Sequence, residues 1–158
     1  MLFSVLKTLH LLAVIVWVGG MVFAHFFLRP ALAQLDPAGR LRLMHGVLGR
    51  FFVAVLVAAS VALVTGSWMI GQIASQTAQA GGRFIMPVSW MVMAALGGVM
   101  ALVFAYIRMV LFRRLDRAVT AANWPAGAAA LASIRQWVLV NLTLGVVIVL
   151  VTLLGPAR

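Results

Sequence analysis

Four long apolar runs, separated by more polar stretches, dominate the chain. They cover about residues 9–28, 51–73, 87–112 and 137–154. An α-helix needs about 20 apolar residues to cross the hydrocarbon core of a bilayer, and each run is close to that length or longer. We therefore expect an all-α integral membrane protein, with residues 1–158 forming one domain, an up-down bundle of four transmembrane helices.

Polar residues and prolines between the runs indicate where helices begin. Asp36-Pro37 and Asn123-Trp124-Pro125 each combine an N-cap residue with a proline in the first turn. The second and fourth helices are thus predicted to begin well before their apolar runs and to protrude from the membrane. The stretch from Gln72 to Gly82 is polar, small and uncharged, and we expect a loop there, with at most a short turn of helix.

Composition agrees with a membrane protein. The chain is 65% hydrophobic and 9% charged, whereas a soluble domain is about half apolar and about a quarter charged. The net charge of +10 does not indicate nucleic acid as a partner, because the basic residues gather at the ends of apolar runs rather than on one solvated face. The expected partner is the lipid bilayer.

The basic residues also predict an orientation. Nine of them flank the first and third connections, namely Arg29, Arg40, Arg42, Arg50, Arg108, Arg113, Arg114, Arg117 and Arg135. Only three lie toward the other side, namely Lys7, Arg83 and Arg158. The positive-inside rule places the arginine-rich connections in the cytoplasm. We expect a bacterial inner-membrane protein whose two termini are both periplasmic.

Few side chains inside the apolar runs can carry chemistry. The runs contain no Asp or Glu and the chain contains no Cys, which excludes a carboxylate proton relay, acid–base pairs and thiolate chemistry. No catalytic residue is assigned, and an enzyme is the less favoured class. His10, Trp17 and His25 lie along one side of the first helix, at about 100° per residue. His10 and His25 are about 22 Å apart, so they belong to an outer and an inner site.

The outer site is a candidate for copper. Met69, Met86, Met91 and Met93 all fall at roughly the depth of His10. Thioether and imidazole ligands suit Cu(I), so these five side chains are the predicted metal ligands. The alternative is that the methionines fill gaps in an apolar core and that His10 forms a hydrogen bond with a neighbouring helix.

The inner site would involve His25 and His45. Both lie near the cytoplasmic boundary, on helices joined by a short connection. They could meet and hold a cofactor, or His45 could be solvated among the arginines that surround it.

Several segments resemble the copper-resistance D (CopD) membrane-domain family. The first-helix segments are Leu6-Lys7-Thr8-Leu9-His10, Trp17-Val18-Gly19-Gly20-Met21 and Leu28-Arg29-Pro30-Ala31. Further matches are Leu48-Gly49-Arg50-Phe51-Phe52, Arg113-Arg114-Leu115, Asn123-Trp124-Pro125 and the stretch from Ile134-Arg135 to Asn141-Leu142. The resemblance covers nearly the whole chain and is strongest to short four-helix members. It implies a role in moving copper across the inner membrane.

The opening is also similar to that of HemJ-type protoporphyrinogen oxidases. That resemblance implies haem b, with His10, Trp17 and Gly20 at the family's first-helix histidine, tryptophan and glycine. Haem could bind at the His10–Trp17 stripe, or between His25 and His45.

Three functions therefore stay open. The favoured one is a protein that binds or passes copper through a His/Met site near the periplasmic face. The second is a haem-b redox protein, either an electron carrier or a haem-dependent oxidoreductase. The third is a structural subunit of a larger membrane complex, and a homo-oligomer is also compatible with the sequence.

Overall fold

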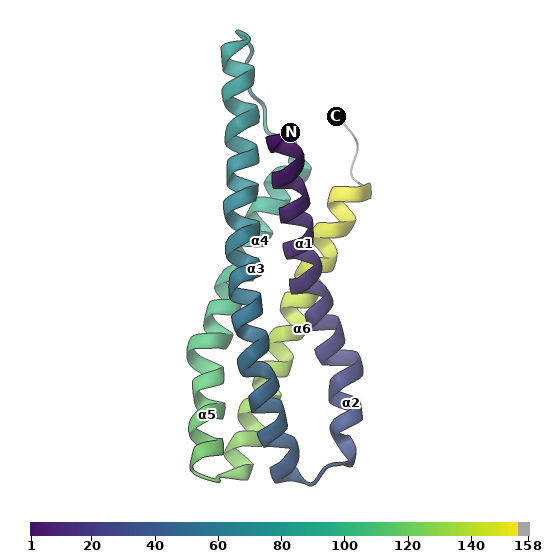
Figure 1. The fold of residues 1–158 in the computed structure, drawn as a ribbon, viewed down its shortest axis with the longest axis vertical. Coiled ribbons are helices and arrows are strands. Elements are labelled where there is room, and N and C mark those ends of the chain that lie inside the picture. The colour runs from purple at the N-terminus through teal and green to yellow at the C-terminus, as the bar shows by residue number, and fades with distance from the viewer. Residues whose placement is uncertain (155–158) are drawn as a thin grey trace.

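The computed structural model describes residues 1–154, which form four long helices that are all long and apolar enough to cross a membrane (Figure 1). The first extends from Leu2 to Gln34. It consists of α1 (Leu2–Val22), the π-helical segment η1 (Phe23–Leu28), α2 (Arg29–Ala31) and a 3₁₀ turn, η2 (Leu32–Gln34).

The second helix is a single element, α3 (Pro37–Gln79). The third joins α4 (Val88–Tyr106) to α5 (Phe112–Thr120) through a second π-helical segment, η3 (Ile107–Leu111). The fourth is α6 (Trp124–Leu154).

The starts of α3 and α6 confirm the capping prediction. The Asp36 carboxylate accepts a hydrogen bond of 3.1 Å from the backbone N–H of Gly39. The side-chain oxygen of Asn123 accepts one of 3.1 Å from the backbone N–H of Ala126. Each cap satisfies an N–H group that has no partner within its helix, and both helices begin long before their apolar runs.

The loop predicted for residues 72–82 is wrong for most of its length, because α3 continues to Gln79. The hydroxyls of Ser75 and Thr77 donate to carbonyl groups one turn earlier in the same helix, at 2.9 and 2.8 Å. Gln and Ala are good helix formers, so a polar stretch rich in them can extend a helix into water. The helix ends where Gly81 adopts a positive φ of 74°, a conformation that favours glycine.

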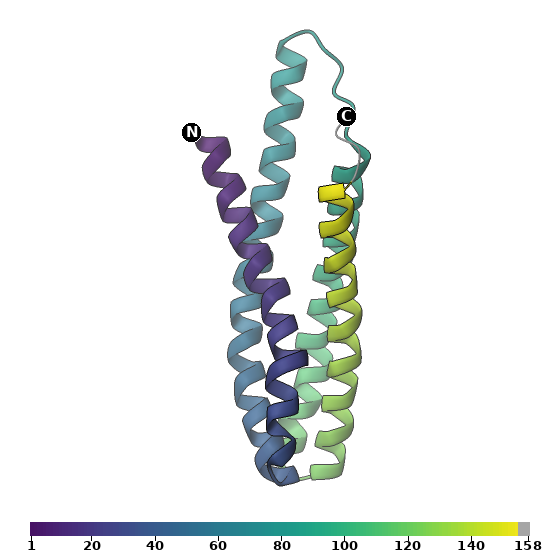
Figure 2. The same ribbon diagram turned by 90° about the vertical axis from the view of Figure 1, so that its right-hand side faces the viewer.

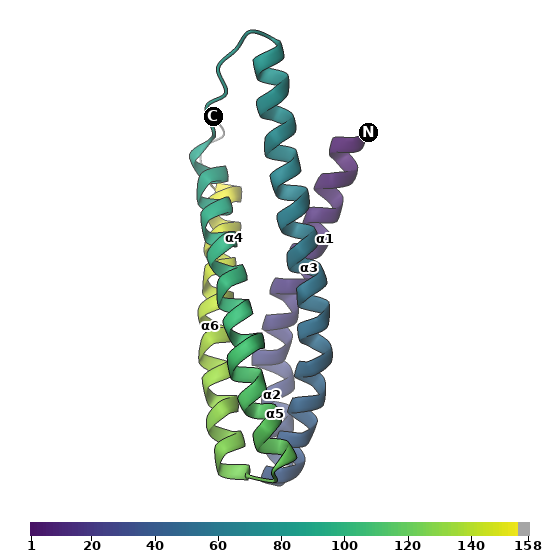
Figure 3. The same cartoon turned by 90° about the vertical axis from the view of Figure 1, so that its left-hand side faces the viewer.

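The helices pack as two pairs that face each other. Helix α1 lies along α3, while α4 and α5 lie along α6 (Figures 2 and 3). The short connections that precede α3 and α6 lie at one end of the molecule. The start of α1 lies toward the other end (Figure 2).

A column of aromatic rings joins the pairs in the core. Trp17 packs edge-on against Phe104, with ring centroids 6.3 Å apart, and Phe104 packs in the same way against Phe52 at 6.0 Å. Phe52 in turn meets Phe112 at 5.3 Å, and the ring of His45 stacks on Phe112 at 5.3 Å. Beyond the Trp17 end of this column, small residues of α3 such as Gly66 let α1 pack closely against α3.

Candidate functional site: the cavity around His10

His10 is held by α3 through one ring nitrogen. Its Nδ1 lies 2.9 Å from the carbonyl oxygen of Ala62 and 3.1 Å from the hydroxyl oxygen of Thr65. The Thr65 hydroxyl donates its own proton to the carbonyl of Val61, at 2.6 Å. Both neighbours of Nδ1 therefore act as acceptors, so Nδ1 carries a proton and donates it. In the neutral ring, Nε2 is then the unprotonated nitrogen and can bind a ligand.

Glycine at position 66 allows this close contact. A Cβ atom on Gly66 would lie 3.2 Å from Cε1 and 3.5 Å from Nδ1 of His10. Small residues let transmembrane helices approach closely, and here the approach brings an imidazole onto the backbone of the neighbouring helix.

The imidazole lines a cavity of about 280 Å³ between α1, α3, α4 and α6. Most of its wall is aliphatic. The side chains that bear on its chemistry are those of His10, Trp17, Met93 and Met100. A volume of this size is near the lower limit for small-molecule pockets, so a metal ion with few ligands fits more easily than a bulky cofactor.

Two thioethers of α4 share the cavity with His10. Met93 and Met100 are seven residues apart, which places both on one face of the helix. Met100 is buried, and its sulfur lies 3.8 Å from the position that a Cβ atom on Gly145 would take. Met100 was not among the predicted ligands, although its spacing from Met93 is a signal that the sequence contains.

The other predicted methionine ligands lie elsewhere. Met91 is 53% exposed on the outside of the bundle. Met69 and Met86 are half-buried, and neither lines the cavity. Of the predicted set, the structure brings only His10 and Met93 together around this space.

Trp17 lies deep in the same cavity. It is 5% exposed, and its ring packs edge-on against Phe104. Trp17 thus belongs both to the lining of the His10 cavity and to the aromatic column, which continues through Phe104.

The two remaining histidines do not share a cavity. His25 lies in η1 and lines a different hollow, beside Arg29. His45 Nε2 lies 2.8 Å from an oxygen of the Asp116 carboxylate, and its ring stacks on Phe112. One imidazole thus contacts a carboxylate, and the other lies in an arginine-lined hollow.

Among residues 1–154, no three side chains of His, Cys, Asp or Glu come close enough to hold a metal ion. A metal in the His10 cavity would accordingly need sulfur ligands from methionine. That donor set, one imidazole nitrogen with thioethers, fits Cu(I) and disfavours Mg²⁺ or Ca²⁺, which prefer oxygen ligands.

The model of the family described as copper resistance protein D matches residues 45–154. The chain belongs to the copper resistance protein D family. The match covers α4, α5 and α6 and most of α3, and so includes three of the four walls of the cavity. Helix α1, with His10 and Trp17, precedes the matched residues. Comparison with curated proteins and with solved structures gives no match.

Membership of this family, together with the four apolar helices, identifies a membrane protein of the copper-resistance class. The similarity to HemJ-type oxidases has no counterpart in these comparisons. His10 lies outside the matched residues, and its contacts with Ala62 and Thr65 of α3 place it beside them.

Proposed function

We propose that this protein binds Cu(I) in the His10 cavity, with Nε2 of His10 and the thioethers of Met93 and Met100 as ligands. The observation that carries the proposal is the arrangement around Nδ1. Ala62 and Thr65 both accept its hydrogen bond, which leaves Nε2 for a ligand, and the cavity that His10 lines is also lined by Met93 and Met100.

The arrangement resembles that of known metal-binding histidines. A histidine that ligates a metal usually donates its other N–H to a backbone carbonyl or carboxylate, which fixes the ring and its tautomer. Ala62 supplies such a carbonyl here. Thioether ligands are neutral and soft, so they suit a monovalent soft ion in an apolar cavity better than charged ligands would.

We further propose that the cavity opens toward the periplasmic side of a bacterial inner membrane. Its lining residues in the first helix, His10 to Val18, belong to the half of that helix that begins at Leu2, and this start lies opposite the end where α3 and α6 begin (Figure 1). The arginine-rich connections lie at the opposite end, and the positive-inside rule assigns that end to the cytoplasm.

Binding is better supported than passage through a single chain. A cation that moved inward from His10 would meet a hollow lined by Arg29, Arg40 and Arg135. Three positive charges there repel a copper ion, so a transfer step would need a second copy of the chain or another membrane protein.

An anaerobic competition titration with Cu(I) tests the proposal. The purified full chain should bind one Cu(I), and His10→Ala should abolish tight binding. Met93→Leu should weaken binding by removing one thioether at nearly constant volume. Met91→Leu is the matched control, because Met91 lies on the exposed face of the same helix and its replacement should leave the affinity unchanged.

The other two functions give different results in the same sample. A haem-b protein would purify with a Soret absorption band that His10→Ala shifts or abolishes. A structural subunit would bind neither copper nor haem, and His10→Ala would only lower its thermal stability. Equal Cu(I) binding by the wild type and His10→Ala would refute the proposed site.

A further inference from the structure

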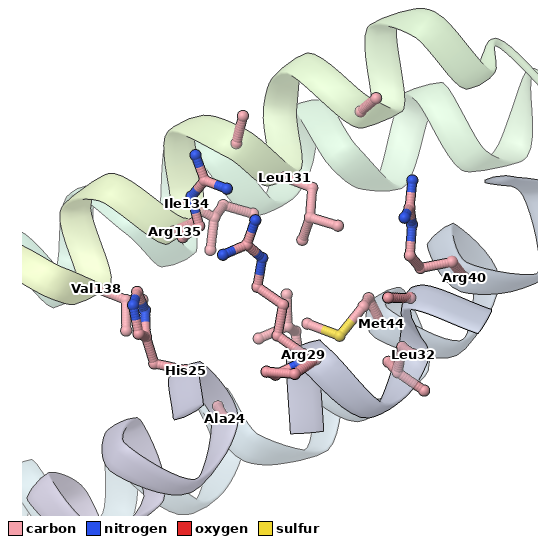
Figure 4. Close-up of a pocket in the computed structure, with 15 residues that line it drawn as sticks. Ala24, His25, Arg29, Leu32, Arg40, Met44, Leu131, Ile134, Arg135 and Val138 are labelled. Carbon is pink, nitrogen blue, oxygen red and sulfur yellow. The ribbon is translucent and has the colours of Figure 1, made fainter. Parts of the chain in front are cut away.

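A second hollow, of about 430 Å³, lies near the cytoplasmic end of the bundle and has a strongly basic wall (Figure 4). Arg29 of α2, Arg40 of α3 and Arg135 of α6 all line it. Figure 4 shows the side chain of Arg29 extending across the hollow toward that of Arg135. The three arginines thus come from three separate helices and line one space, with Arg29 and Arg135 extending toward each other and Arg40 lying farther along the hollow.

These groups are charged at any physiological pH, because arginine does not lose its proton in proteins. Three like charges around a partly enclosed space repel each other more strongly than they would in bulk water. Negative charge bound between them would therefore stabilise the arrangement.

The chain itself does not supply that charge. It contains two acidic residues, Asp36 and Asp116. Asp36 caps α3, and Asp116 pairs with His45. Neither lines the hollow. A negative charge in the hollow would therefore come from another molecule.

Other arginines near this end have neighbours of a different kind. The guanidinium of Arg42 lies 5.1 Å from the ring of Trp124, and that of Arg108 lies 5.1 Å from the ring of Phe112. Such cation–π contacts stabilise the charged guanidinium group beside the aromatic ring. The arginines of the hollow are distinct because they line one space together, and Arg29 extends toward Arg135.

The backbone beside the hollow is also irregular. The π-helical segment η1 (Phe23–Leu28) carries His25 into the wall and ends immediately before Arg29. Short π-helical segments within α-helices are frequent at functional sites. Here the segment directly precedes Arg29.

The depth of the hollow matches a membrane surface. Helix α6 extends from Trp124 to Leu154, so its part from Arg135 onward is about 30 Å long. That length equals the hydrocarbon thickness of a typical bilayer, about 30 Å. Arg135 therefore lies at the level of lipid headgroups.

Apart from these arginines and His25, the wall is apolar. Met44 of α3 and Leu131, Ile134 and Val138 of α6 line the space beside the arginines. An amphiphilic ligand, with a charged group next to an apolar part, would fit both kinds of wall.

We propose that this hollow binds the phosphate group of an anionic ligand, either a phospholipid headgroup of the adjacent leaflet or a soluble phosphate. Guanidinium groups bind phosphate oxygens through paired, charge-assisted hydrogen bonds. Three of them from separate helices would tie α2, α3 and α6 together through the ligand. The site is independent of the His10 cavity and of copper.

The lipid source is tested with the full chain in phosphatidylcholine nanodiscs, with and without phosphatidylglycerol. Native mass spectrometry should detect phosphatidylglycerol retained by the wild type. The double variant Arg29→Gln/Arg135→Gln should bind it about 30-fold more weakly, which corresponds to about 2 kcal/mol. The control is Arg113→Gln/Arg114→Gln, which removes the same charge from exposed positions outside the hollow and should retain the lipid.

The soluble source is tested in nanodiscs of phosphatidylcholine alone. Inorganic phosphate should then raise the unfolding temperature of the wild type saturably, beyond the effect of chloride at equal ionic strength. If the double variant does not fold, Arg135→Lys replaces it, since it keeps the charge but loses the paired hydrogen bonds and should bind more weakly. The proposal fails if neither ligand binds the wild type, or if the control variant loses as much binding as the double variant.

Discussion

Thr65→Val tests whether the acceptors around Nδ1 of His10 prepare this ring to bind copper. Thr65 is 5% exposed, and valine has nearly its shape, so the change removes one hydroxyl and little else. The Val61 carbonyl, which accepts the Thr65 hydroxyl proton, also lies within the backbone of α3. The substitution therefore leaves Nδ1 with the Ala62 carbonyl as its single acceptor.

The magnitude follows from that remaining contact. Changes to a group that orients a metal-binding histidine lower metal affinity about 10–100-fold. Because the 2.9 Å contact with Ala62 persists, we expect the lower limit, about tenfold or about 1.4 kcal/mol. A single neutral hydrogen bond contributes a similar amount, about 0.5–1.5 kcal/mol.

The assay is the anaerobic Cu(I) competition titration, with Thr65→Ser as the matched control. Serine keeps the hydroxyl and loses a methyl group, so it should lower thermal stability but preserve Cu(I) affinity. Thr65→Val keeps the methyl group but removes the hydroxyl, so it should weaken Cu(I) binding about tenfold. Wild-type affinity in Thr65→Val, or equal losses in both variants, would refute the role given to this hydroxyl.

Two further predictions concern stability, measured by thermal unfolding in detergent. A Cβ atom on Gly20 would overlap the ring of Phe51, whereas one on Gly19 has no neighbour within 4 Å. Gly20→Ala should therefore be less stable than Gly19→Ala by about 1–3 kcal/mol, and equal stabilities would contradict the packing of α1 on α3. The buried side-chain oxygen of Asn141 has no partner within residues 1–154, so Asn141→Leu should stabilise the protein by about 1 kcal/mol or more. A loss of stability would mean that this oxygen binds something.

The helices could be predicted from the sequence because their determinants are local. Asp36 and Asn123 are followed by prolines, and they cap α3 and α6 as expected. The end of α3 is harder to predict, because the polar stretch from residue 72 to 82 favours a loop when polarity alone is considered. A helix that leaves the membrane can remain helical in water when its residues favour that conformation, as the stretch up to Gln79 does.

The candidate site was only partly predictable. Depth along a helix follows from residue counting, and His10 and Met93 do share a cavity. Which face of each helix turns inward depends on packing between helices that are distant in sequence. Position in the sequence therefore did not separate Met93 from the exposed Met91, or identify the buried Met100.

The inner histidines illustrate the same limit. The short connection between the first two helices suggested that His25 and His45 could meet. In the structure, His45 instead pairs with Asp116 of α5, a partner 71 positions away. No pattern in the sequence links these two residues.

Cu(I) binding at His10 is tested most directly by an optical spectrum and an elemental analysis of the same detergent-purified sample, before and after addition of Cu(I). A Cu(I) site at His10 predicts that the wild type lacks a Soret band and takes up one Cu(I), and that the His10→Ala sample takes up none. A Soret band with iron near one atom per chain, or copper uptake that does not depend on His10, would contradict it.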